Sequence, residues 1–165
     1  MKIRNARMED VKAIHALLNH FADKGLLLGR SISSLYDQLR DFVVCCDGQD
    51  RVVGACALHI CWENLAEIRS LAVDETAQGQ GIGTRLVRRC LQVADELGIG
   101  RVFTLTYQRP FFLGLGFTDI DKRELPHKIW SDCLNCSKFP DCDEEALIFS
   151  REEETHKTLL FGGDR

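Results

Sequence analysis

The sequence lacks three features, and each absence removes a class of function. No apolar run is long enough to cross a bilayer, and no apolar segment follows the basic residues near Met1, so we expect a cytoplasmic protein with no membrane partner. Positive charge is not in excess: the net charge is −4 and the basic residues are scattered, which argues against nucleic-acid binding. The chain also has no internal repeat and no low-complexity linker.

Cysteine is present but too sparse for a disulfide scaffold. The eight cysteines are unevenly spaced in 165 residues, so reduced thiols are expected, and Cys56 and Cys90 fit as small core hydrophobes. Only Cys133, Cys136 and Cys142, preceded by His127, have spacing suited to a tetrahedral zinc ion. One C-x2-C pair is a weak pattern. A structural zinc and a loop of reduced thiols therefore remain alternatives.

Apolar periodicity predicts alternating strands and helices over most of the chain. Strands are expected at 2–6, 42–46, 51–61, 65–73, 102–107, 117–120 and 146–149, with helices at 11–25, 31–39, 82–97 and 111–115. This order predicts an α/β fold in which helices cover both faces of a mixed sheet. The alternation breaks at 71–73, which predicts a β-bulge. We expect one domain over 1–150, with a cysteine-rich loop at 127–143, followed by a tail at 151–165.

A glycine-rich turn lies between the strand predicted at 65–73 and the helix predicted from residue 82. It reads Gln78-Gly79-Gln80-Gly81-Ile82-Gly83-Thr84. Glycine allows a phosphate to approach the main chain, and the amides and dipole of a helix N-terminus bind a diphosphate. The spacing is not the G-x-G-x-x-G of a dinucleotide site. Taken alone, the pattern also fits a flexible turn capped by glycine.

Three segments together carry a resemblance to a known family. The spacing Gln78-x-x-Gly81-x-Gly83, the preceding EIRSLAV and the later FFLGLGF resemble the GCN5-related N-acetyltransferase (GNAT) family over residues 2–120. The resemblance implies that family's α/β fold, a mostly antiparallel sheet splayed at the acetyl-CoA site. It also implies acetyl-CoA as co-substrate. Main-chain groups of Leu71, Ala72 and Val73 would then meet the pantetheine arm, and the diphosphate would lie on Gln78, Gly79, Gln80, Gly81, Ile82, Gly83 and Thr84.

A finer resemblance concerns the acceptor. The segments LLGRS, LAEIRSLAV, VFTLTYQ and ELPHKIWSDCLNCSKFPDCDE are similar to the short stand-alone bacterial N-acetylglutamate synthases of arginine biosynthesis. Those enzymes acetylate the α-amino group of L-glutamate. The resemblance implies Arg30 as the partner of a glutamate carboxylate, because a guanidinium fork matches a carboxylate bidentately. Arg69 and Lys128 are further candidates, whereas His127 is more simply a surface histidine. Among resembling proteins homodimers are common.

The chemistry of direct acetyl transfer predicts which residues act as the base, as the oxyanion donor and as the partner of the departing sulfur. An α-amino group has a pKa of about 8, so a base must accept a proton, and Glu67 is the candidate. The main-chain amide of Ser70 is the candidate oxyanion donor, an interaction that contributes about 3 kcal/mol where it is well aimed. Many family members protonate the departing sulfur with a tyrosine where this chain has Phe112. Thr106 is a weak replacement and Tyr107 another, and a thiol of pKa about 8.5 also leaves as thiolate.

Two other functions remain open. The acceptor could be another amine, such as a different amino acid, a polyamine or a protein N-terminus. Alternatively, the chain could be an acetyl-CoA-binding sensor without turnover, since Phe112 lacks the usual hydroxyl. An amine panel with detection of released thiol separates these functions. A catalytic metal is not expected, because a thioester is already activated.

Overall fold

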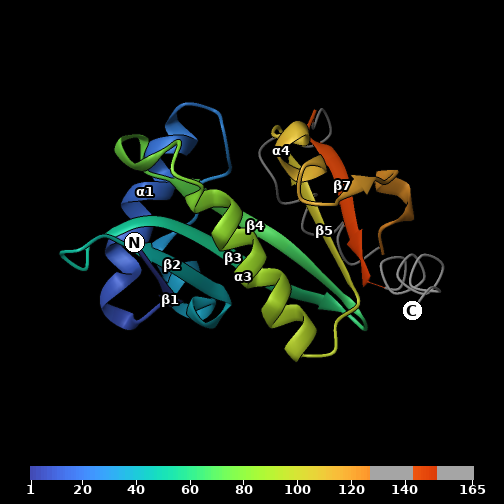
Figure 1. The fold of residues 1–165 in the computed structure, drawn as a ribbon, viewed down its shortest axis with the longest axis horizontal. Helices are drawn as coiled ribbons and strands as arrows, with labels where there is room; N and C mark the ends of the chain where they lie inside the picture. Colours follow the sequence, from blue (N-terminus) through green and yellow to red (C-terminus); the bar gives the residue numbers. More distant parts are fainter. Residues whose placement is uncertain (127–142, 152–165) are drawn as a thin grey trace, which may run out of the picture. The chain divides into compact units, whose positions relative to one another are not determined.

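A computed structural model describes residues 1–126 and 143–151 (Figure 1). The order of helices and strands is the predicted one, with bounds that differ by a few residues at most, and short 3-10 helices are added between them. The strands are β1 (Lys2–Asn5), β2 (Phe42–Cys46), β3 (Val52–Trp62), β4 (Leu65–Val73), β5 (Arg101–Thr106), β6 (Thr118–Asp119) and β7 (Glu145–Ser150). The helices are α1 (Val11–Asp23), α2 (Ile32–Asp37), α3 (Ile82–Glu96) and α4 (Arg109–Leu113). The 3-10 helices are η1 (Met8–Asp10), η2 (Leu39–Asp41), η3 (Glu75–Ala77) and η4 (Lys122–Glu124).

The strands form one seven-stranded sheet in the order β1-β2-β3-β4-β5-β7-β6. The pairs β1–β2, β2–β3, β5–β7 and β6–β7 are antiparallel. The predicted α/β class with a mostly antiparallel sheet is therefore confirmed. The chain divides into two compact units, the first made of Met1–His59 and Ile68–Val93, and the second of Ile60–Glu67 and Ala94–Arg165.

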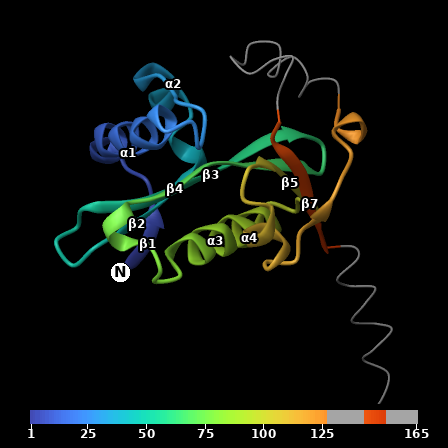
Figure 2. The ribbon, with the colours of Figure 1, turned by 90° about the horizontal axis from the view of Figure 1, so that it is seen from above.

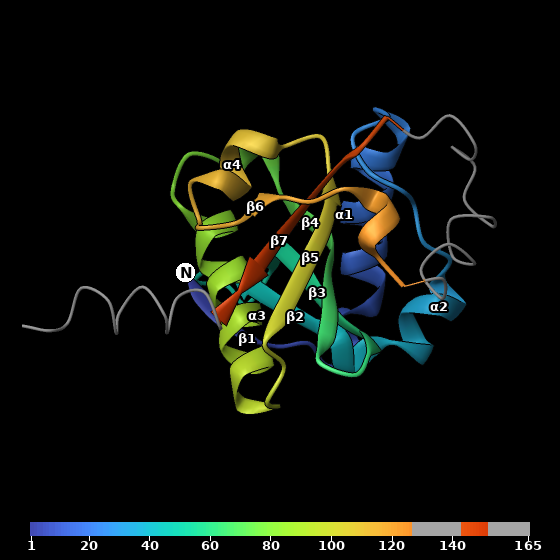
Figure 3. The ribbon, with the colours of Figure 1, turned by 90° about the vertical axis from the view of Figure 1, so that its right-hand side faces the viewer.

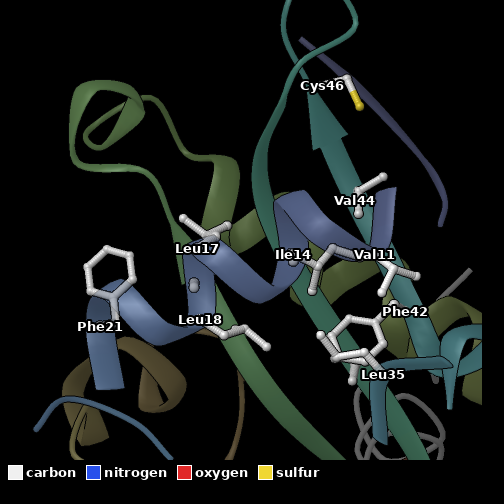
Figure 4. Close-up of a cluster of buried hydrophobic side chains, with 12 residues drawn as sticks. Val11, Ile14, Leu17, Leu18, Phe21, Leu35, Phe42, Val44 and Cys46 are labelled. Atoms are coloured by element: carbon white, nitrogen blue, oxygen red, sulfur yellow. The ribbon is translucent and has the colours of Figure 1, made fainter. Parts of the chain in front are cut away.

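In the first unit, helices cover both faces of the strands. Figure 2 shows α1 and α2 on one face and α3 on the other. The helical spacing of α1 aims its apolar side chains at β2, and Leu35 of α2 joins them (Figure 4). The side chain of Ser31 caps α2 by accepting a hydrogen bond from the Ser34 amide at 3.1 Å. Arg30 lies in the short segment that connects α1 to α2, and both of these helices belong to this packed layer.

A buried ion pair ties β1 to the start of α1. Arg4 Nη1 lies 2.6 Å from Asp10 Oδ2, and the two side chains are only 9% and 6% exposed. The main-chain amide of Arg7 also donates to Asp10 Oδ2, at 2.7 Å. Burial alone would raise the pKa of the Asp10 carboxyl, but the hydrogen bonds from Arg4 and Arg7 outweigh it and lower this pKa. Asp10 is therefore expected to stabilise the fold in its ionised form.

Replacing Asp10 by Asn should lower the free energy of unfolding by about 3 kcal/mol, because Arg4 is left buried without its buried counter-ion. Because the folded-state pKa of Asp10 is lowered, its contribution is present above the pH at which an unfolded-state aspartate titrates. It is lost as the pH falls through the folded-state pKa. Urea unfolding between pH 7 and pH 2 should therefore show a weaker acid dependence in Asp10→Asn than in the wild type.

Asp50→Asn is the matched control, since Asp50 Oδ1 lies 3.6 Å from Arg4 Nη2 but its side chain is 62% exposed. An exposed pair of this kind contributes at most about 1 kcal/mol. Equal losses of stability in the two variants would show that burial of the Arg4–Asp10 pair does not matter.

The second unit is organised around β5 and β7, which lie side by side with β6 beyond β7 (Figure 3). One apolar cluster joins Cys61, Leu65, Phe103 and Leu125. A second group is aromatic: the ring of Phe112 lies edge-on to Phe111 and Phe117, with centroid distances of 5.0 and 5.1 Å. Phe112 is thus a packing residue of α4.

The described residues bear on two expectations, the lack of a membrane-spanning helix and the burial of Cys56 and Cys90. No helix there is long and apolar enough to cross a membrane. Cys45, Cys46, Cys56 and Cys90 are buried and carry no disulfide. A side-chain hydrogen bond with the neighbouring Cys90 is the main cause that raises the pKa of Cys56, and burial raises it further. Cys56 and Cys90 are core residues, as predicted.

Candidate functional site

Strand β4 is distorted at Ser70. Its φ is 54°, in the left-handed region that non-glycine residues seldom adopt. The distortion lies one residue before 71–73, where the broken alternation predicts a bulge. Such backbone strain inside a strand is concentrated at functional sites, because it turns a main-chain group out of the regular ladder. Main-chain groups at this point of β4 can therefore serve a ligand.

The segment after β4 is tied back to the sheet by its own polar groups. The amide of Asp74 donates to the Val53 carbonyl at 2.7 Å, and the Asp74 side chain accepts from the amide of Thr76 at 2.9 Å. Hydrogen bonds from the Thr76 hydroxyl and amide lower the pKa of Asp74. The Gln78 amide group donates to the Val73 carbonyl at 3.1 Å. Gln78 therefore holds the start of the turn against the end of β4.

The turn itself presents bare main chain at the start of α3. Gly79 and Gly81 have φ values of 79° and 75°, and no atom lies within 4 Å of the Cβ that either would carry. The first intrahelical hydrogen bond runs from the Arg85 amide to the Gly81 carbonyl at 3.1 Å. The preceding amides, of Ile82, Gly83 and Thr84, have no acceptor within the helix, as in the first turn of any α-helix. The site is suited to an anion.

Gly54 of β3 sets how closely α3 approaches the sheet. A Cβ on Gly54 would lie 3.0 Å from Leu86 Cδ1 and 3.1 Å from Ile82 Cγ2, both in α3. Absence of that atom lets the first turns of α3 pack directly on β3. The helix N-terminus is thereby placed next to the end of β4, within the first unit.

Helix α1 also contacts this segment. Lys24 Nζ forms an ion pair with Glu75 Oε1, and His20 Nε2 lies 3.4 Å from the same oxygen. The hydrogen bond from Lys24 is the main cause that lowers the pKa of Glu75. Because these side chains are about half exposed, the pairs add little to stability. They connect the C-terminal end of α1 with η3, directly before the glycine turn.

Arg30, the candidate for a substrate carboxylate, lies in the first unit before α2. Its Nη2 atom donates to Ser34 Oγ at 3.0 Å and to Gln38 Oε1. The guanidinium carbon lies 5.3 Å from the centroid of the Phe42 ring, which is a cation–π arrangement. The arginine is partly buried, not a freely solvated surface residue. Arg69, in β4 of the same unit, is also partly buried.

The candidate acid and base residues belong to the second unit. Glu67 is 6% exposed in β4, and Thr106 is buried at the end of β5. Thr106 Oγ1 accepts a hydrogen bond from the Gln108 amide at 2.8 Å, so its own hydroxyl proton can be donated elsewhere. The hydroxyl of Tyr107 donates to Asp143 Oδ1 at 2.6 Å. Thr106 is therefore better suited than Tyr107 to serve a departing sulfur.

A model of the acetyltransferase (GNAT) family matches residues 12–117, a range that contains both the distorted strand and the glycine turn. The chain belongs to the GNAT family. An uncharacterized N-acetyltransferase of Chlorobaculum tepidum is 42% identical, covering 88% of this chain and 94% of that protein. The amino-acid acetyltransferase of Mycobacterium tuberculosis is 40% identical, covering 79% of this chain and 75% of that protein.

A solved structure extends the comparison. The N-acetylglutamate synthase of Neisseria gonorrhoeae, complexed with coenzyme A and N-acetyl-glutamate, has a TM-score of 0.83 and 28% identity. The match covers 90% of this chain but 34% of that longer one. Together with the family model, these relatives show that this GNAT protein is an N-acetyltransferase that uses acetyl-CoA. The space beside Gly79 and Gly81 is open, with no atom within 4 Å of the Cβ that either would carry.

Two groups of predicted site residues lie outside the described residues of this GNAT protein. They are Lys128, a substrate candidate, and the zinc candidates Cys133, Cys136 and Cys142 with His127. Within 1–126 and 143–151, no three His, Cys, Asp or Glu side chains gather in a way that could hold a metal ion.

One polar pair of this acetyltransferase was missed by the sequence analysis. His59 Nδ1 in β3 lies 2.7 Å from Asp41 Oδ2 in η2. A sequence signal did exist, because His59 is the only titratable side chain apart from cysteine in the otherwise apolar run Val52–Trp62. Its partner, 18 positions earlier, could not be read from a pattern.

Proposed function

We propose that the protein transfers the acetyl group of acetyl-CoA to the α-amino group of L-glutamate, as a cytoplasmic enzyme of arginine biosynthesis with residues 1–150 as its catalytic domain. The observation that carries the proposal is the match over 90% of the chain to an N-acetylglutamate synthase complexed with coenzyme A and N-acetyl-glutamate. The amino-acid acetyltransferase of Mycobacterium tuberculosis, at 40% identity, supports the same class of acceptor.

We assign the acetyl-CoA contacts to the main chain of the first unit. Amides of residues 78–84 bind the diphosphate, because two glycines leave them bare and the N-terminal dipole of α3 favours an anion. Main-chain groups of Leu71, Ala72 and Val73 hydrogen-bond the pantetheine arm. The Ser70 amide, at the left-handed position of β4, donates to the acetyl oxygen as negative charge develops there.

Glu67 and Thr106 handle protons in this proposal. Glu67 accepts a proton from the attacking nitrogen, directly or through one water. Thr106 donates its hydroxyl hydrogen bond to the departing sulfur, while Gln108 holds the threonine oxygen from the other side. Phe112 cannot take this role, because its ring is packed against Phe111 and Phe117 and carries no hydroxyl. Thiolate departure with only a hydrogen-bond donor is chemically sufficient, since a thiol has a pKa of about 8.5 and its thiolate is therefore an adequate leaving group.

Arg30 is the proposed partner of a glutamate carboxylate, with Arg69 and Lys128 as further candidates. The contacts with Ser34, Gln38 and Phe42 hold the Arg30 guanidinium in one place before substrate arrives. A guanidinium held in this way loses less conformational entropy when it binds a carboxylate.

Arg30→Ala should raise the KM for glutamate by about 10- to 30-fold and change the KM for acetyl-CoA by less than about twofold, because a charged hydrogen bond contributes about 1.5–3 kcal/mol. Released thiol is measured with glutamate and with a panel of other amino acids, polyamines and peptide N-termini. Arg51→Ala is the control, since Arg51 is exposed in the β2–β3 turn and pairs with Asp47. Equal effects of Arg30→Ala on both KM values would remove Arg30 from the acceptor site.

The same panel decides between glutamate and other acceptors. Faster turnover of a different amine would replace glutamate by that acceptor within the same acetyltransferase chemistry. Binding of acetyl-CoA with no turnover of any amine would favour the sensor function.

A structural zinc ion is a separate proposal, and well under one equivalent of zinc in the purified protein would rule it out. A homodimer is also proposed, to be checked by sedimentation.

A further inference from the structure

The C-terminal end of α1 is held firmly within the first unit. Leu17, Leu18 and Phe21 in its last turns are buried in the apolar cluster of Figure 4. The helix is closed by Gly25, whose φ is 71° and whose amide donates to the Ala22 carbonyl at 2.9 Å. A close-packed apolar face and a closed C-terminus leave this end of the helix little freedom to move.

Residues 74–78 join β4 to the glycine turn and are attached to the sheet at two points. At the first, the Asp74 amide donates to the Val53 carbonyl at 2.7 Å, and at the second the Gln78 side chain donates to the Val73 carbonyl at 3.1 Å. The buried methyl group of Ala77 adds packing but no directional bond. Two attachments define an axis, so a third contact is needed to set the orientation of η3 about it.

Glu75, the first residue of η3, makes such a contact with α1. Its Oε1 atom forms an ion pair with Lys24 Nζ and lies 3.4 Å from His20 Nε2. His20 and Lys24 are four positions apart, so their side chains leave the same face of the last helical turn. One carboxylate oxygen therefore joins η3 to two cationic or hydrogen-bonding groups on a helix end that is already fixed.

This contact serves neither the stability of the fold nor, by its charge, the binding of an anion. The three side chains are between 45% and 51% exposed, so the contact adds little to the free energy of unfolding. A carboxylate three positions before the proposed diphosphate turn would by charge alone weaken the binding of a diphosphate. The benefit that remains is geometric, since any rotation of η3 passes directly into the turn that follows it.

We propose that Glu75 is a positioning residue for acetyl-CoA: through Lys24 and His20 it sets the orientation of η3, and so of the main-chain amides that bind the diphosphate. Glu75 acts through the turn and does not itself touch the coenzyme. A turn that is held in its binding orientation before the ligand arrives loses less conformational entropy on binding. The inference rests on the proposed diphosphate site at residues 78–84, but it does not depend on which amine is the acceptor.

Glu75→Ala is expected to raise the dissociation constant and the KM of acetyl-CoA about fivefold, with kcat and the KM of the acceptor within about twofold. The sign of the change is diagnostic, because removal of a negative charge near a diphosphate would by charge alone lower both constants. Isothermal titration with coenzyme A gives the dissociation constant. Thiol release with the amine that the wild type turns over fastest gives the kinetic constants.

A double-mutant cycle tests whether the contact with Lys24 is the cause. Lys24→Met should raise the dissociation constant of coenzyme A about fourfold in the wild-type background but by less than about twofold in the Glu75→Ala background, since the contact is already lost there. Glu9→Gln is the matched control for charge: Glu9 is an exposed glutamate before the opposite end of α1 and lies 3.5 Å from Arg7. It should bind coenzyme A as the wild type does.

An affinity for coenzyme A in Glu75→Ala that equals or exceeds that of the wild type would overturn the inference, and so would effects of Glu75→Ala and Lys24→Met that simply multiply in the double variant. Gly81→Ala separates this failure from failure of the proposed site. Lost affinity in Gly81→Ala with wild-type affinity in Glu75→Ala removes only the role of Glu75, whereas unchanged affinity in Gly81→Ala removes the diphosphate from the turn. Should Glu75→Ala not fold, as judged by circular dichroism, Glu75→Gln decides, with an expected rise of at least about twofold.

Discussion

Glu67→Gln is expected to lower kcat by about 1,000-fold and to leave the dissociation constant of acetyl-CoA within about twofold. Glutamine has nearly the shape of glutamate, so the nearly buried position, 6% exposed in β4, should tolerate it. What is lost is the ability to accept a proton from the attacking nitrogen. Thiol release gives kcat, and isothermal titration with coenzyme A gives the affinity.

Glu63→Gln provides the comparison for this variant. Glu63 is an exposed residue in the turn between β3 and β4, so the change in charge is the same while the strand is untouched. Its kcat should stay within twofold of the wild type. A Glu67→Gln enzyme that retains a third of wild-type kcat would show that another group accepts the proton.

Gly81→Ala should raise the dissociation constant and the KM of acetyl-CoA by about 100-fold, equivalent to one or two hydrogen bonds to a charged group at about 1.5–3 kcal/mol each. The new methyl group contacts no protein atom, because nothing lies within 4 Å of that position, so it occupies the space proposed for the diphosphate. The φ of 75° adds a strain of about 1–2 kcal/mol, which should lower the melting temperature modestly.

Gly98→Ala separates strain from binding. Gly98 follows α3 with a φ of 77° and also has nothing within 4 Å of its Cβ position. The two variants should therefore lose similar stability, while only Gly81→Ala loses affinity for acetyl-CoA. A similar loss of affinity in both would mean that strain propagated through α3 is responsible. An unchanged affinity in Gly81→Ala would remove the diphosphate from this turn.

Local sequence patterns predicted the order of helices and strands because each depends on few residues at a time. The helical apolar spacing from Val11 to Phe21 and the run before Ser70 are signals of this kind. The glycine turn was also readable, since a positive φ at Gly79 and Gly81 is what glycine permits at no steric cost. The irregularity in β4 was predicted from broken alternation and lies within one residue of the expected place.

Contacts between residues far apart in the chain could not be predicted from the sequence. Asp41 and His59 are 18 positions apart, and Lys24 and Glu75 are 51 apart, so no periodicity connects them. The packing role of Phe112 is of the same type, because its partner Phe117 becomes a neighbour only through the turn after α4. The roles of Glu67, Ser70, Thr106 and Arg30 remain predictions that the variants above test.

The sequence by itself determined the fold class, the family and the position of the glycine turn, because apolar period, glycine placement and short motifs are local properties of the chain. Only the tertiary structure decided which residues meet: the Arg4–Asp10 pair, the His59–Asp41 pair, and the packing that places α3 on Gly54. The physical reason is that such contacts depend on strand register and helix packing, which arise when the whole core forms and leave no trace in a short segment.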